Sequence, residues 1–186
     1  MNLKPGDKIS YKVSFLEMDR SPNFDWPEKL PGENLILHSK NPSSRYFFDL
    51  YNAVGAEYEW TDKHAMPIKE INDFLSHSSV RMFTFLKDGW TAGFFILDYR
   101  DKVICDLAYF GLVPEAIGQG YGKYLLKYAI KESWKHSEMR LLTVNTNTLD
   151  HPNALRLYLN VGFKLTKTKT ETRILTRSRD TNSNIN

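Results

Sequence analysis

One stretch of the chain combines an apolar run, a glycine-rich turn and a helical face. Residues 107–126 read LAYFGLVPEAIGQGYGKYLL. Their first residues belong to an apolar run over 103–113, which predicts a strand. A glycine inside a strand indicates a bulge or a close approach of other backbone, and Gly111 takes that position. Beyond the turn, apolar residues recur at the spacing of one helical face: Leu125, Leu126, Ala129 and Ile130.

The turn between this strand and this helix is suited to an anion. Gly118, Gly120 and Gly122 lack Cβ atoms, so a phosphate can approach the backbone N–H groups at the start of the helix. A P-loop requires Ser or Thr after Gly-Lys, and here Tyr124 follows Lys123. The spacing of the three glycines also differs from the Rossmann fingerprint. On its own the turn is weak evidence, and a purely structural turn stays open as the alternative.

The residues on either side predict a mixture of strands and helices in one domain over 1–177, followed by a disordered tail over 178–186. Strands are expected at 11–16, 35–37, 80–86, 90–97 and 141–144. Helices are expected at 46–54 after a cap at Asn41-Pro42, at 67–75, and after a cap at 150–152 through Leu159. Residues 163–165 and 172–175 are expected to form a closing hairpin.

Composition excludes several classes of protein. The 186 residues carry a formal net charge of only +3, without the long Lys/Arg run typical of nucleic-acid binders. A short basic cluster, Arg173, Arg177 and Arg179, is interpreted as a solvated strand end and tail. Residues 1–10 lack the apolar stretch of a signal peptide, and no window suggests a membrane span.

The single cysteine indicates the cellular compartment. Cys105 lies in an apolar run, which predicts a buried and unreactive thiol in a reducing compartment. His64 and His77 show no metal-ligand spacing, so no metal is expected. We therefore expect a cytoplasmic protein that binds neither nucleic acid nor membranes.

The stretch 107–126 resembles the coenzyme A-binding motif of the GNAT N-acetyltransferase superfamily. That motif runs from an apolar strand through a Pro-Glu turn and a glycine turn into a helix that opens with Leu-Leu. A second block at 151–163, HPNALRLYLNVGF, resembles the later motif Asn-x-x-Ala-x-x-x-Tyr-x-x-x-Gly-Phe. Two positions depart from the pattern: Ile117 replaces Arg or Gln, and His151 replaces Asn.

The resemblance implies an α/β (α+β) fold with a mixed, mostly antiparallel sheet flanked by helices. A splayed parallel pair of strands would receive the coenzyme, within a binding core over about residues 80–165. Acetyl-CoA would be the acyl donor. The implied coenzyme-binding residues are Phe110, Gly111, Leu112, Ile117, Gly118, Gln119, Gly120, Tyr121, Gly122, Lys123 and His151. Among them, the N–H of Leu112 would polarise the thioester carbonyl.

The resemblance also implies two catalytic residues. Tyr158 would be the general acid, because a phenol is protonated at neutral pH and can donate to a leaving thiolate. Asp106, in an otherwise apolar strand, would be the general base, often through water. Both residues also have structural interpretations: Tyr158 as a core residue of an amphipathic helix, and Asp106 as an exposed or salt-bridged carboxylate.

The acceptor is expected to be a primary amine, either a small molecule or a protein N-terminus. Carboxylates interleaved with aromatic rings suit a cationic amine. The residues expected to bind it are Glu57, Trp60, Asp62, Asn145 and Asn147. Two other classes stay open, a non-catalytic acyl-CoA-binding module and a nucleotide-binding structural domain. A homodimer formed through a sheet edge is also compatible with the sequence.

Overall fold

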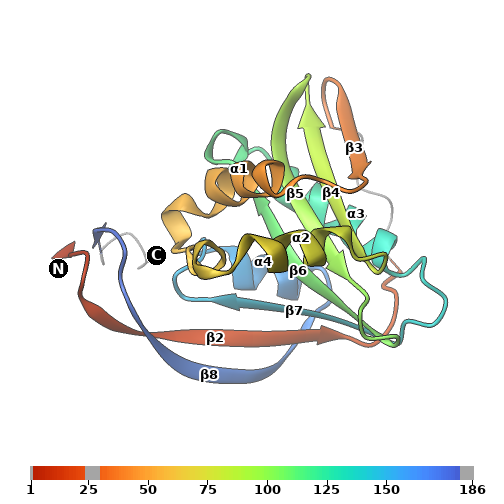
Figure 1. Cartoon of the computed structure of the whole chain (residues 1–186). Helices are drawn as coiled ribbons and strands as arrows, with labels where there is room; N and C mark the ends of the chain where they lie inside the picture. The colour runs from red at the N-terminus through yellow and green to blue at the C-terminus, as the bar shows by residue number, and fades with distance from the viewer. Residues whose placement is uncertain (1, 24–29, 181–186) are drawn as a thin grey trace.

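A computed structural model describes residues 2–23 and 30–180 of the protein (Figure 1). Its main sheet has seven strands in the order β3-β4-β5-β6-β7-β2-β8. Their bounds are β2 Lys8–Met18, β3 Asn34–Ser39, β4 Val80–Lys87, β5 Trp90–Asp98, β6 Ile104–Leu112, β7 Leu141–Asn147 and β8 Lys164–Ile174. Within the described chain, β6 and β7 form the parallel pair and the other neighbours are antiparallel. The mixed, mostly antiparallel sheet expected from the sequence is therefore confirmed.

Helices cover both faces of this sheet. The α-helices are α1 Ser44–Gly55, α2 Ile68–Ser76, α3 Tyr121–Ser133 and α4 Ala154–Asn160, and short 3-10 turns are η1 Ala56–Tyr58, η2 Asp62–Ala65 and η3 Pro114–Ala116. Neighbouring residues along a strand point to opposite faces of the sheet, so consecutive residues of β6 contact helices on different faces. The ring of Tyr109 contacts Phe47 of α1, and the ring of Phe110 contacts Tyr158 of α4.

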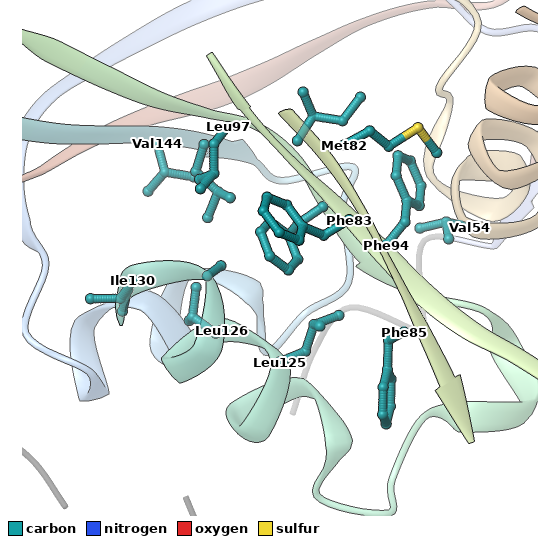
Figure 2. Close-up of a cluster of buried hydrophobic side chains, with 14 of the residues drawn as sticks. Val54, Met82, Phe83, Phe85, Phe94, Leu97, Leu125, Leu126, Ile130 and Val144 are labelled. Atoms are coloured by element: carbon teal, nitrogen blue, oxygen red, sulfur yellow. The ribbon is translucent and has the colours of Figure 1, made fainter. Parts of the chain in front are cut away.

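One part of the core lies between the central strands and α3, and another lies under α1 and α2. Phe83 of β4 and Phe95 of β5 stack with ring centroids 4.7 Å apart. Figure 2 shows the apolar face of α3 directed at these strands, with Leu125, Leu126 and Ile130 in the same layer as Phe83. These three residues are 0–1% exposed, so the helical face expected from their spacing is confirmed. Cys105 is buried here too, as expected.

Two helix starts differ from the sequence interpretation. The side chain of Ser43 caps α1 by accepting a hydrogen bond from the N–H of Tyr46, whereas Asn41 adopts a left-handed backbone conformation with φ 50°. Asn tolerates that conformation better than most residues, so it ends the preceding strand connection rather than starting the helix. Helix α4 begins at Ala154 with Asn153 at its cap, and Asp150 has another role described below.

The predicted closing hairpin is wrong. Residues 164–174 form one strand, β8, which pairs with β2 from Lys8 opposite Ile174 to Glu17 opposite Lys164. Its alternating Lys and Thr residues lie at the sheet edge and are mostly exposed, so they lack the apolar signal of a buried strand. The predicted tail also begins too early, because Arg179–Asp180 form β9, paired with β1 Asn2–Leu3. Residues 181–186 lie outside the described residues.

The irregularity of β6 falls at Ala108 rather than at Gly111. Ile96 pairs with Tyr109 and Leu97 with Leu107, so Ala108 is the extra residue of a bulge. Gly111 instead lies under α1, and a Cβ atom there would stand 2.2 Å from Cγ1 of Val54. The sequence suggested a bulge or a close approach of backbone at this glycine; the close neighbour is instead the side chain of Val54.

Candidate active site

The strands β6 and β7 part in the middle of the sheet and leave a pocket between them. Their parallel pairing joins residues 104–106 to 141–143, yet β6 continues to Leu112 and β7 to Asn147. The bulge at Ala108 lies two residues after Asp106, the last residue that pairs with β7, and bends β6 at this point. The pocket has a volume of about 460 Å³ and is lined by both strands, the glycine turn, α4 and the α1–α2 connection. The splayed parallel pair is thus present.

The end of strand β6 offers a backbone hydrogen-bond donor to this pocket. In an antiparallel pair, opposite residues alternate between hydrogen-bonded and non-hydrogen-bonded positions. The N–H of Val113 donates to the carbonyl of Ala92 on the β5 side, so the preceding pair, Gly93 and Leu112, is a non-hydrogen-bonded one. The N–H of Leu112 therefore points away from β5, toward the gap between β6 and β7. Phe110, Gly111 and Leu112 all line the pocket.

The glycine turn supplies further backbone donors at the start of α3. Gly118 and Gly120 have φ of 82° and 81°, in the left-handed region that glycine adopts freely. Gly120 is the N-cap of α3, and no side chain of the described residues caps this end. The first N–H groups of the helix are therefore open to an anion. Gly118, Gly122 and Lys123 line the pocket beside them.

The other residues expected around the coenzyme divide into two groups. Ile117 and His151 line the pocket. Gln119 lies outside it, and its Nε2 donates to the carbonyl of Glu115, which closes the turn. Tyr121 is 7% exposed and its ring packs edge-on against Phe85, so only its backbone faces the turn.

Tyr158, the expected general acid, lines the pocket from α4. Its side chain is 5% exposed and lies between the rings of Phe110 and Phe163, with centroids at 6.1 Å and 5.8 Å. Burial raises the pKa of Tyr158, and the ionised forms of Asp150 and Asp106 raise that pKa further. The phenol is therefore protonated at neutral pH and available as a donor.

Asp106, the expected general base, lies outside the pocket lining. It is the last residue of β6 that pairs with β7, and Oγ1 of its partner Thr143 donates to its Oδ1 at 2.7 Å. Burial raises the pKa of its carboxyl group, against the lowering effect of that hydrogen bond. The carboxylate of Asp106 therefore lies where β6 and β7 begin to part, and its hydrogen bond to Thr143 links the two strands.

Asp150 is a pocket residue that the sequence reasoning treated as a helix cap. Its Oδ1 accepts from Nε1 of Trp60 at 3.3 Å, and its Oδ2 accepts from Oγ1 of Thr146 at 2.8 Å and from the N–H of Asn147 at 2.9 Å. Burial raises the pKa of this carboxyl group, although the hydrogen bonds oppose the rise. Since Trp60 is 90 residues away along the chain, no local pattern could reveal the contact.

Three aromatic rings form a wall of the pocket where the α1–α2 connection meets the sheet. Tyr51 lies 5.4 Å from Trp60 and 5.9 Å from Tyr109, and Trp60 and Tyr109 are also 5.9 Å apart, between ring centroids. Each of them lines the pocket. Burial raises the pKa of Tyr51 to about 12, so its hydroxyl group stays neutral. A wall of this kind suits an ammonium group or the carbon skeleton of an acceptor.

The basic cluster near the chain end is not solvated as expected. Glu59 has a fully buried side chain, and its carboxylate lies 3.8 Å from Nη2 of Arg173 and 3.8 Å from Nε of Arg177. The same carboxylate accepts from the N–H and Oγ1 of Thr176. Arg179 donates from Nη2 to the carbonyl of Leu149. The cluster therefore joins the end of β8 to the α1–α2 connection beside the pocket.

The residues expected to bind the acceptor are mostly at the pocket. Trp60, Asp62, Asn145 and Asn147 line it, whereas Glu57 is exposed and lies outside. The residues missed by sequence reasoning, besides Asp150, are Tyr51, Tyr109 and Arg173. Their elements are distant in sequence, and only the sheet order brings them together.

No group of three or more metal-ligating side chains occurs among residues 2–23 and 30–180. None of the helices in that described part combines the length and the apolar character needed to cross a membrane.

Comparison with known families decides what this arrangement is related to. The model of the acetyltransferase (GNAT) family matches residues 19–163. The chain belongs to the GNAT acetyltransferase family. Members of this family are acetyltransferases, so the resemblance in the two motifs is confirmed at the level of the family. No curated protein matches the sequence.

Solved structures of GNAT proteins share the fold at low sequence identity. A GCN5-related N-acetyltransferase from Kribbella flavida superposes with a TM-score of 0.58 and 14% identity, covering 87% of this chain and 56% of that one. A tandem GNAT protein of the clavulanic acid biosynthesis pathway gives 0.61 and 15%, covering 92% and 55%. The chain thus spans little more than half of each.

A third structure contains the acyl donor. A GNAT family acetyltransferase from Elizabethkingia anophelis with acetyl-CoA bound gives a TM-score of 0.54 at 18% identity, covering 72% of this chain and 78% of that chain. At such identities the likeness concerns the fold alone.

Proposed function

We propose that this GNAT protein is an acetyl-CoA-dependent N-acetyltransferase that acts on a primary amine. One observation carries the proposal: the pocket between the splayed strands is lined both by the glycine turn before α3 and by Tyr158. A backbone anion cradle and a protonated phenol in one pocket are what a thioester donor with a thiolate leaving group requires.

The backbone groups would hold and polarise the donor. The open N–H groups at the start of α3 would bind its pyrophosphate, and Lys123 in that first turn adds a positive charge. The N–H of Leu112, directed into the gap, would donate to the thioester carbonyl oxygen as negative charge develops there. A donor aimed at that oxygen stabilises the transition state more than the bound substrate.

The transfer itself moves one acetyl group and two protons. The nitrogen lone pair of the neutral amine attacks the carbonyl carbon, the carbon–sulfur bond breaks, and Tyr158 gives its proton to the departing thiolate. The nitrogen loses a proton to a carboxylate. Asp106, acting through water, was our expectation for this base, but Asp150 lines the pocket and Asp106 does not. We therefore assign Asp150 as the better-placed acceptor of that proton.

The donor is tested first by ligand stabilisation. Melting curves of the protein with acetyl-CoA, CoA, ATP and NAD at matched concentrations should show stabilisation by the two CoA species alone. A ligand at 100 times its Kd adds about 2.7 kcal/mol to the free energy of unfolding, a shift that a melting curve resolves easily. If CoA and acetyl-CoA leave the curve unchanged, the proposal fails.

The chemistry is tested with paired variants and an acceptor panel read by thiol release. Tyr158→Phe should lower kcat about 10²–10⁴-fold with little change in acetyl-CoA binding. Tyr99→Phe is the matched control, because this buried phenol donates to the carbonyl of Ser133 and lies outside the pocket. Equal activity of Tyr158→Phe and wild type would remove the general acid from the mechanism and favour a different assignment.

The two carboxylates are separated by the pH dependence of kcat/KM. The base must be ionised, so activity should fall as pH decreases through its pKa, which burial raises above 3.8 for both residues. Asp150→Asn should abolish this acid limb, and Asp106→Asn should keep it. The reverse result would restore Asp106 as the base.

A further inference from the structure

We propose that the acceptor carries a carboxylate in addition to its amine, as an amino acid does, and that Arg173 binds this carboxylate. This inference rests on the proposed N-acetyltransferase function and names the substrate class for the same pocket. It begins from a guanidinium group that β8 places at the pocket.

Arg173 reaches the pocket from the edge of the sheet. It lies on β8 opposite Ile9 of β2, and two further residues of β2, Tyr11 and Val13, line the pocket beside it. Its side chain is 17% exposed, and its Nη2 donates to Oγ1 of Thr61 at 2.8 Å. Its Nε is buried without a hydrogen-bond partner among the residues that the structure describes. The guanidinium is thus fixed in place and retains donor capacity.

The nearby carboxylates engage only Nη2 of this guanidinium. Oε2 of Glu59 is 3.8 Å from Nη2 and accepts both hydrogen bonds of Thr176, while Oε1 lies 3.8 Å from Nε of Arg177 and has no hydrogen-bond partner in the described structure. Oδ1 of Asp62 accepts a long hydrogen bond of 3.5 Å from the same nitrogen, but the Asp62 side chain is 82% exposed, so water screens its charge.

Three arginines beside the pocket share two buried carboxylates, Glu59 and the largely buried Asp150. Arg173 and Arg177 lie 3.8 Å from Glu59, and each of the three arginines, Arg179 included, has one buried nitrogen without a partner in the described structure. A buried donor without a partner is costly, and native proteins usually provide one. Of the three arginines, Arg173 lines the pocket, so it is the one that a ligand can reach.

A carboxylate is the anion that fits this position. Guanidinium groups bind planar carboxylates through paired hydrogen bonds. The phosphates of the donor are assigned to the start of α3, which belongs to a different part of the pocket lining. The aromatic wall of Tyr51, Trp60 and Tyr109 and the carboxylate of Asp150 provide the neighbouring environment for the carbon skeleton and the amine. An acceptor with a carboxylate at one end and an amine at the other matches Arg173 on one side and Asp150 with the aromatic wall on the other.

The test measures binding in the presence of CoA, which permits a dead-end complex without turnover. The probes are L-amino acids and their carboxamides, in pairs that differ only in the charge of the carboxyl group. For the wild type we expect at least one amino acid to bind about 10-fold or more tightly than its amide, the effect of a charge-assisted contact. Arg173→Gln should abolish that preference and leave the Kd of acetyl-CoA unchanged.

Arg177→Gln is the matched control. Its guanidinium lies at the same 3.8 Å from Glu59 as that of Arg173, but it does not line the pocket. This variant should keep the preference for the carboxylate. An equal loss in both variants would show a general effect of the Glu59 cluster and overturn the proposal.

The remaining outcomes also separate the two proposals. If amides or simple amines bind as tightly as the amino acids, or if none of the carboxylates binds, the acceptor class is wrong. Stabilisation by acetyl-CoA, together with thiol release from amines that lack a carboxylate, would then leave the acetyltransferase function standing. Absence of acetyl-CoA binding would instead reject the function itself.

Discussion

The contact between Gly111 and α1 predicts a specific loss of stability that a second substitution repairs. In Gly111→Ala the new Cβ would stand 2.2 Å from Cγ1 of Val54, against ordinary carbon–carbon contacts of about 3.5–4.0 Å. Val54 is 2% exposed and β-branched on a helix, so its side chain cannot rotate away freely. Overpacking of this kind costs about 1–3 kcal/mol. Replacing glycine also restricts the unfolded chain, which offsets about 0.4–1 kcal/mol of that cost.

The assay is a double-mutant cycle by chemical denaturation. Val54→Ala alone should lose about 1.5 kcal/mol, from two buried methyl groups at about 0.8 kcal/mol each. Because the shorter side chain on α1 makes room for the methyl group at position 111, the double variant should be more stable than the sum of the single effects by about 1 kcal/mol or more. Additive effects within about 0.5 kcal/mol would refute the steric explanation for this glycine.

Two further predictions concern buried groups away from the reaction. Glu59→Gln should destabilise the protein by about 3 kcal/mol, as measured by urea denaturation. This value is near the lower end for breaking a buried ion pair, because Arg177 is 40% exposed. A change below about 0.5 kcal/mol would contradict the role of Glu59 as the counter-charge of the arginines. Burial raises the pKa of the Cys105 thiol to about 12, so the native protein should not react with a thiol reagent at pH 8 and should react fully in denaturant; rapid labelling of the native state would show that Cys105 is accessible.

The central part of the fold could be predicted because its signals are local. The glycine turn, the apolar face of α3 and the strands before it lie within one continuous stretch, and the second motif block contains Tyr158. Of the positions expected from these motifs, 110–112, 118, 122 and 123 line the pocket, whereas 119–121 do not. Backbone functions are easiest to predict in this way, since glycine reports directly on local conformation.

The part of the pocket lined by Asp150 and Arg173 was less accessible to prediction, because it depends on pairings between distant parts of the chain. Asp150 is recognisable as a pocket residue only once Trp60 is known to donate to it. Arg173 seemed to belong to a polar chain end, because the Lys/Thr pattern of β8 resembles a solvated segment. An edge strand exposes most of its side chains and needs no apolar alternation, so its sequence carries little information on its pairing.

The pairing of β2 with β8 also affects how the protein forms during synthesis. The two strands run side by side as one long curved ribbon, although β2 comes from the start of the chain and β8 from near its end (Figure 1). Until residue 174 has left the ribosome, β2 is the edge of the sheet, with unpaired backbone groups and the half-exposed Phe15 available to other chains. Of the seven strands of the main sheet, β8 is therefore the last to be added in chain order. A chain truncated before β8 would keep both motif blocks yet expose an aggregation-prone edge.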